Sequence, residues 1–239
     1  MCSSDLAEAV RRFAGTMRKE ATRLAALVHE IIELSRLQVA GALEQPGIVD
    51  VDKVIAEAAE RAQTTATAKG VALTASAAAT HVYGDHAMLV TAVRNLVDNA
   101  VAYSEAGSHV GIGASERDGV VEIAVVDQGA GIPPEQQVRI FERFYRVDPA
   151  RSRETGGTGL GLSIVKHVAA DHGGDVTVWS EPGRGSTFTL RVPAATLPPG
   201  VTEREGVQLG ADDDEGAATD PRPADGAMDL DPTSPQETA

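Results

Sequence analysis

Apolar side chains recur every seven residues near the start of the chain, over about 6–40. They fill two seam positions, which are Val10, Met17, Leu24 and Ile31, then Leu6, Phe13, Leu27 and Leu34, with Glu20 as the one polar interruption. This spacing predicts one amphipathic helix of roughly 50 Å. A lone rod leaves its seam exposed, and a break follows at Gly41 and Pro46-Gly47. We therefore expect a partner helix, either from a preceding segment or from another subunit.

The pattern changes over residues 47–192, where helical and alternating periods are mixed. Helices are expected over about 52–68, 86–103 and 159–172, with Asp85 as the N-cap of the second. Strands are expected over 71–74, 109–114, 120–127, 175–180 and 186–192, with a hairpin turn at Arg117-Asp118-Gly119. Helices that alternate with strands of mostly antiparallel order predict an α+β, two-layer α/β sandwich.

The C-terminal end of the chain is strongly acidic. The chain has 239 residues and a formal net charge of −14. Residues 198–239 contain 11 acidic and two basic side chains, which leaves −5 for the rest, and also six of the 12 prolines and no aromatic residue. Such a segment does not bury enough apolar surface to fold, so a disordered tail is predicted. Its charge indicates either simple solvation or a docking role.

Composition also excludes several classes of function. An acidic chain lacks the basic footprint that nucleic acid or an anionic membrane surface requires. The one cysteine, Cys2, excludes an intrachain disulfide and a cysteine-based zinc site. We see no membrane-spanning run and no signal peptide, so the sequence indicates a cytoplasmic chain. The expected organisation is a partial helix over 1–40, a linker over 41–50, a compact domain over 51–194 and the tail over 195–239.

Two stretches carry candidate polar chemistry. Asn95 and Asn99 are four residues apart on a predicted helix, so they share one face, and their amide oxygens suit Mg²⁺. An apolar strand then delivers Asp127 to a loop in which Gly129 and Gly131 permit close backbone approach. A partly buried carboxylate there needs a donor, such as the exocyclic amine of adenine. Taken singly, the first pair also fits capping asparagines, and Asp127 also fits an ordinary turn.

Two further stretches suit an anion. Glycines 156, 157, 159 and 161 open a predicted helix, whose free N–H groups and dipole suit phosphate, although a plain linker has the same composition. Between the loops lies Phe141-Glu142-Arg143-Phe144-Tyr145-Arg146. Its aromatic residues fit a core position or the anchor of a lid, and its arginines can reach phosphates or remain solvated.

These four stretches, in this order, resemble the ATP-binding catalytic domain of bacterial sensor histidine kinases, which has the Bergerat type of sandwich. The helix ending in Leu34-Ser35-Arg36-Leu37 resembles the second helix of the dimerisation and histidine-phosphotransfer hairpin. Arg151-Ser152-Arg153 and Val165–Ala170 are similar to actinobacterial phosphate-responsive sensor kinases. The intact protein would then be a homodimer anchored in the cell membrane, although this chain itself makes no direct membrane contact.

The resemblance implies a role for each matched residue. Asn99 would coordinate Mg²⁺ with support from Asn95, and Asp127 would bind the adenine amine in a pocket shaped by Gly129 and Gly131. Tyr103 and Thr187 would contact the adenine end, Thr187 through water. Gly157, Gly159, Leu160 and Gly161 would form the phosphate loop, and Arg146 would meet the terminal phosphates. Residues 133–158 would be the ATP lid.

Two departures from the family pattern matter. Ala102 stands where the family often has lysine, and the family's phosphorylated histidine, in a His-Glu/Asp-x-x-x-Pro segment, is missing. The six histidines are His29, His81, His86, His109, His167 and His172, and only His29 precedes an acid, without the proline. We expect ATP and Mg²⁺ to bind, a separate histidine-bearing helix to accept the phosphoryl group, and a response-regulator receiver domain to take it next. A serine-directed kinase and a non-catalytic ATP-binding module remain alternatives.

Overall fold

The computed structural model describes residues 8–18, 20–21, 24–25, 28, 32, 43, 45–147 and 157–195. The chain divides into two units, Met1–Pro199 and Gly200–Ala239, and every described residue belongs to the first. The predicted disordered tail therefore lies outside the described residues, except for Ala195. No described helix combines the length and the apolar composition needed to cross a bilayer.

The predicted N-terminal helix is helical wherever it is described. Residues 8–18 form continuous helix, and the described positions from 20 to 32 are helical too. Three seam side chains, Val10, Phe13 and Met17, are between 58% and 68% exposed. An apolar seam this open is what the heptad pattern predicts for a helix that packs against a second helix.

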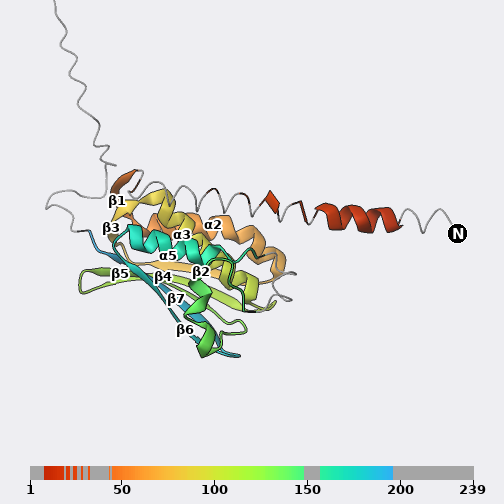
Figure 1. Ribbon diagram of the computed structural model, residues 1–239. Helices are drawn as coiled ribbons and strands as arrows, with labels where there is room; N and C mark the ends of the chain where they lie inside the picture. Colours follow the sequence, from red (N-terminus) through yellow and green to blue (C-terminus); the bar gives the residue numbers. More distant parts are fainter. Residues whose placement is uncertain are drawn as a thin grey trace, which may run out of the picture. The chain divides into compact units, whose positions relative to one another are not determined.

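A five-stranded sheet forms one layer of the domain (Figure 1). Its strands, in spatial order, are β2 (Ala72–Ala77), β4 (His109–Arg117), β5 (Val120–Asp127), β7 (Gly185–Pro193) and β6 (Asp175–Glu181). Only the β2–β4 pair is parallel, and the other three pairs are antiparallel. The predicted mixed, mostly antiparallel sheet is confirmed.

Three helices cover one face of this sheet, as Figure 1 shows. They are α2 (Val51–Lys69), α3 (His86–Tyr103) and α5 (Gly161–Asp171), and α3 contacts both of the others. The core between the layers is built from the inward faces of both, including Leu96 of α3, Ile164 of α5 and Phe188 of β7. The two-layer α+β sandwich predicted from the sequence is therefore confirmed.

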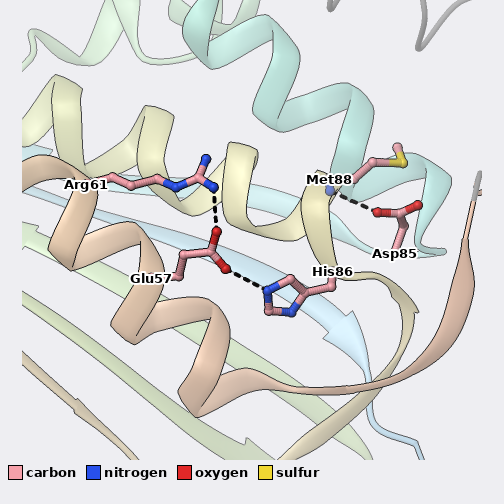
Figure 2. A network of polar contacts seen from close by, with 5 residues as sticks. All are labelled: Glu57, Arg61, Asp85, His86 and Met88. Carbon is pink, nitrogen blue, oxygen red and sulfur yellow. Dashed lines mark hydrogen bonds and ion pairs between the residues drawn. The ribbon is translucent and has the colours of Figure 1, made fainter. Parts of the chain in front are cut away.

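The junction between α2 and α3 is fixed by polar contacts (Figure 2). Asp85 caps α3 as predicted, because its Oδ1 accepts a hydrogen bond of 3.1 Å from the backbone N–H of Met88. The carboxylate of Glu57, on α2, contacts two side chains. Its Oε2 lies 2.8 Å from His86 Nε2, and its Oε1 accepts a hydrogen bond of 2.5 Å from Arg61 Nη2. The start of α3 is thus fixed by its own cap and by its neighbour helix.

The structure corrects the predicted linker. Residues 46–50 form strand β1 (Pro46–Asp50), which pairs antiparallel with β3 (His81–Asp85) in a separate two-stranded sheet. Val49 and Val51 are buried in the core of the domain. The ordered domain therefore begins about five residues earlier than position 51.

Candidate functional site

A cavity of about 490 Å³ lies between helix α3, the ends of strands β5 and β7, and the loops before and after the undescribed segment 148–156. Nine of the twelve site residues predicted from the sequence line it, namely Asn95, Asn99, Tyr103, Asp127, Gly131, Arg146, Gly157, Gly159 and Gly161. Segments more than 60 residues apart along the chain thus contribute to one site.

Helix α3 presents an oxygen-rich face to the cavity. Asn95 and Asn99 line it one turn apart, and Asp98 lines it between them. The amide nitrogen of Asn95 donates to the carbonyl of Thr91 at 2.9 Å, which leaves its amide oxygen for a ligand. Burial raises the pKa of Asp98, and the ion pair with Arg94, at 3.3 Å, opposes that shift.

This oxygen set fits Mg²⁺. Hard oxygen ligands suit the ion, which keeps waters and substrate phosphates for its remaining positions. Among the described residues, no group of three or more His, Cys, Asp or Glu side chains gathers as a metal centre. The described residues thus offer oxygen ligands on one helical face, which fits an ion that takes its remaining ligands from water and phosphate.

Asp127 is the buried acid of the site. It is only 6% exposed, and its Oδ1 accepts backbone hydrogen bonds from Gly129 at 2.8 Å and from Ser186 at 3.2 Å. Burial raises the pKa of Asp127, while these donors lower it in part. Both backbone donors use the same oxygen, so the carboxylate is held in one orientation at the wall of the cavity.

Glycines let other backbone segments close around Asp127. A Cβ atom at Gly185 would lie 2.0 Å from the carbonyl oxygen of Asp127, and one at Gly131 would lie 2.1 Å from that of Glu181. Gly131 also has a φ of 69°, which L side chains rarely adopt. The carboxylate therefore sits where three strands and a loop meet without room for side chains.

The glycine-rich loop leads into the N-terminus of α5, which begins at Gly161. Gly159 has a φ of 80°, and a Cβ atom there would lie 2.9 Å from the backbone of Phe144. The two loops meet at this point, because the N–H of Phe144 donates to the carbonyl of Gly159 at 2.8 Å. A helix N-terminus beside the cavity offers N–H groups and a positive dipole end to an anion.

Arg146 supplies a cation at the same end of the cavity. Its Nε and Nη2 atoms are buried and have no hydrogen-bond partner within the described residues. Burying unpaired guanidinium N–H groups is costly, so the arrangement is suited to an anion that enters the cavity and accepts from them.

The cavity thus combines apolar and polar lining. Ile140, Tyr145 and Phe188 are among its apolar residues, and Asp127, Arg146, the glycine loop and the α3 oxygens supply its polar groups. This arrangement suits a flat base that carries an amine, joined to a phosphate chain and a divalent cation.

Comparison with known proteins identifies the family of this chain. A family model described as histidine kinase-, DNA gyrase B- and HSP90-like ATPase matches residues 84–196. The solved mycobacterial sensor histidine kinase MprB is 33% identical, with a TM-score of 0.57, and the match covers 64% of this chain and all of that one. The chain belongs to the sensor histidine kinase family.

Further relatives define which part of a histidine kinase is present. The sensor-like histidine kinase SenX3 of Mycolicibacterium smegmatis is 52% identical over 194 residues, which is 81% of this chain and 50% of SenX3. A full-length ShkA structure in complex with AMPPNP is 32% identical, with a TM-score of 0.66, over 78% of this chain and 39% of ShkA. The chain spans about half the length of the curated relatives it matches, and carries the ATP-binding catalytic portion.

Three predicted site residues of this histidine kinase domain lie elsewhere than in the cavity wall. Gly129 acts behind it, as a donor to Asp127. Leu160 is fully buried in the core, so its side chain packs rather than binds. Thr187 lies on β7 next to Ser186, and it is Ser186 that lines the cavity. Successive side chains of a strand face opposite sides, so Ser186 faces the cavity where Thr187 was expected to do so.

The sequence contained a signal for Ser186. Phe188 and Leu190 are strongly apolar and alternate with Thr189 and Arg191, which predicts that 186, 188 and 190 share the inward face. No histidine lines the cavity within the described residues, and His29, the one histidine followed by an acid, lies outside them.

Proposed function

We propose that this chain binds Mg·ATP in the cavity and acts as the catalytic portion of a protein-histidine kinase, whose acceptor histidine is on a separate helix. The observation that carries the proposal is one cavity that joins the buried Asp127 carboxylate to Arg146, whose buried Nε and Nη2 lack partners, and to the Asn95–Asn99 face. In that site Asp127 accepts from the adenine amine, and Tyr103 and Ser186 lie against the base and ribose end.

The phosphate end is served by different groups. The N–H groups of Gly157, Gly159 and Gly161 bind the phosphate chain, and Arg146 binds its terminal part. Asn99, supported by Asn95, holds Mg²⁺, which when bound offsets the negative charge on the phosphate oxygens. Ala102 offers no cation, so Arg146 carries more of the charge than it would beside a lysine.

The reaction proposed is phosphoryl transfer to imidazole. A histidine nitrogen attacks the γ-phosphorus, the bond to the bridging oxygen breaks with ADP as the leaving group, and the ring loses one proton to solvent. The protein contributes positioning and charge stabilisation. The phosphoryl group then passes to an aspartate of a response-regulator receiver domain.

The partners follow from the open seam of the N-terminal helix. Val10, Phe13, Met17 and Leu24 are each more than half exposed. We propose that a histidine-bearing helix of the same family packs against them, and that the intact protein is a homodimer. In this proposal the intact protein is anchored in the cell membrane, its catalytic portion lies in the cytoplasm, and its signal is phosphate. This arrangement has three separate parts, which are the partial helix over 1–40, the catalytic domain that ends near 194, and the acidic tail.

The test supplies the acceptor in trans. The full chain is mixed with a helical hairpin that carries a His-Glu-x-x-x-Pro segment, and with ATP labelled at the γ-phosphate. We expect acid-labile, base-stable label on the hairpin and none on the chain alone. Acid-stable label would favour the serine-directed kinase, and ATP binding without any transfer would favour the non-catalytic module. Label on the isolated chain would contradict the missing acceptor, and His29→Ala would then show whether His29 is the acceptor.

A further inference from the structure

Ser180 of strand β6 joins three parts of the molecule through a single hydroxyl. Its Oγ accepts from the backbone N–H of Ile132 at 2.8 Å, donates to the carbonyl of Gly185 at 3.0 Å, and lies 3.0 Å from the hydroxyl of Ser186. Ser180 does not line the cavity, whereas Ile132 and Ser186 do. The hydroxyl therefore acts on the cavity wall from behind.

The loop after β5 is fastened to the same point by Gln137. Its Nε2 donates to the carbonyl of Ile132 at 3.0 Å and to the carbonyl of Ser180 at 2.9 Å. The backbone N–H and C=O of Ile132 are thus both bound, one by Ser180 and the other by Gln137. Each of these bonds joins segments more than 40 residues apart, except for the local one from Gln137 to Ile132.

The chain of contacts ends at the buried acid. Ser186 donates its backbone N–H to Asp127 Oδ1 at 3.2 Å, the longer of the two backbone bonds that orient this carboxylate. Ser180 sets the position of that donor in two ways, through the preceding carbonyl of Gly185 and through the Ser186 side chain. Removing the Ser180 hydroxyl deletes both of these bonds and leaves strand pairing alone to place the donor, whose bond of 3.2 Å is already at the long end of the normal range.

A count of hydroxyl protons shows how the two serines cooperate. Ser180 has one hydrogen, so when it donates to Gly185 it must accept from Ser186. When Ser180 donates to Ser186 instead, the hydroxyl hydrogen of Ser186 can point towards the Asp127 carboxylate. In both arrangements, the Ser186 hydroxyl is kept directional by Ser180.

We propose that Ser180 is a positioning residue for the adenine end of the site, and that it sets selectivity for the 6-amino group of the purine by holding Ser186 and Ile132 in the cavity wall that also contains Asp127. The inference rests on the proposed function, because it takes Asp127 as the acceptor of that amine. Ser180 touches no part of the nucleotide itself. Its effect is expected at the base, since none of its hydrogen bonds reaches Arg146 or the glycine loop, which is held by the bond from the N–H of Phe144 to the carbonyl of Gly159.

The experiment compares two nucleotides on the full chain. ATP and purine riboside triphosphate, which lacks the 6-amino group, displace a fluorescent nucleotide from the wild type and from Ser180→Ala. We expect the variant to bind ATP about five- to tenfold more weakly, from the loss of buried hydrogen bonds, and purine riboside triphosphate within about twofold of the wild type. Thr177→Ala removes a hydroxyl from the exposed face of the same strand and is expected to change neither affinity.

The outcomes separate this inference from the proposed function. A wild type that binds neither nucleotide overturns both. A wild type that prefers ATP while Ser180→Ala keeps the same preference overturns only the role of Ser180, as does an equal loss for the two nucleotides. If the alanine variant does not fold, Ser180→Cys keeps the shape with a weaker donor, and a reduced ATP preference in that variant supports the inference while an unchanged one overturns it.

Discussion

The amide oxygen of Asn95 lies 2.8 Å from the point that a Cβ atom on Gly161 would occupy. This contact joins the oxygen-bearing face of α3 to the first residue of α5, so the proposed metal face and phosphate loop share one boundary. Glycine at 161 leaves room for the amide of Asn95 in this orientation, and the backbone does not require glycine there, since Gly161 has no positive φ.

Replacing Gly161 with alanine tests this boundary. The new methyl group would push the Asn95 side chain away from the cavity, because 2.8 Å is closer than real Cβ contacts allow. We expect the affinity for Mg·ATP, measured by calorimetry, to fall about tenfold, with little loss of stability, because the group that must move is the far end of a flexible side chain. Gly47→Ala is the control, since a Cβ atom there meets nothing within 4 Å. An unchanged affinity would show that Asn95 has no part in binding.

Local signals in the sequence account for what was predictable. Asp85 precedes an apolar-periodic run, which marks it as an N-cap, and it caps α3 at the predicted residue. Asp118 and Gly119 have φ values of 53° and 75°, the two positive angles of a tight hairpin turn that this pair of residues favours. In both places, the residue type and its neighbours decide the structure without help from distant segments.

Non-local pairing accounts for what was not predictable. The residues of β1 find their partners in β3, more than 30 positions later, and five residues around a Pro-Gly break resemble a linker when read alone. Thr187 and Ser186 have similar chemistry, and a shift of one residue on a strand moves the side chain to the other face. The contacts of Ser180 and Gln137 link segments with no common motif, so only the folded chain brings them together.

Gly84 and His172 form a tight pair whose effect is on stability. A Cβ atom on Gly84 would lie 2.2 Å from the ring of His172, whose Nε2 accepts the backbone N–H of Asp85 at 3.0 Å. We expect Gly84→Ala to lower the free energy of unfolding by about 1–3 kcal/mol, and His172→Ala to do so by a similar amount, because a buried N–H loses its acceptor. In urea denaturation, the double variant should lose less than the sum of the two single losses. Strictly additive losses would show that the ring and the glycine do not constrain one another.

A substitution at Arg146 tests the proposed phosphate-binding end of the site separately from the base-binding end. Arg146→Gln removes the charge but keeps a side chain of similar reach, so we expect the affinity for ATP to fall about tenfold, as for loss of a charged hydrogen bond. Adenosine, which has no phosphate, should bind within about twofold of the wild type in the same displacement assay. Arg191→Gln is the control, since Arg191 is paired with Glu122 on the exposed face of the sheet, 2.7 Å away. Equal losses for adenosine and ATP would place Arg146 away from the phosphates.

Asp127→Asn is expected to separate binding from stability. An asparagine oxygen still accepts from Gly129 and Ser186, but its NH₂ group would face the adenine amine, donor against donor. We expect ATP affinity to fall about 10- to 100-fold, while Asp118→Asn, in the exposed β4–β5 turn, changes nothing. Without nucleotide, the variant should be more stable than the wild type at neutral pH, because it no longer buries an ionised carboxylate.

The pH dependence fixes the sign of that stability difference. Burial raises the pKa of Asp127 in the folded chain, so the wild type has its full stability from this group below the unfolded pKa of about 3.9 and loses it as pH rises through the folded value. The Asp127→Asn variant has no such ionisation. Its advantage in urea denaturation should therefore be largest at pH 7 and shrink as the pH falls towards 4.5. An advantage that stays constant or grows on acidification would mean that the carboxylate is stabilised in its ionised form, and that the cavity holds a donor for it without any ligand.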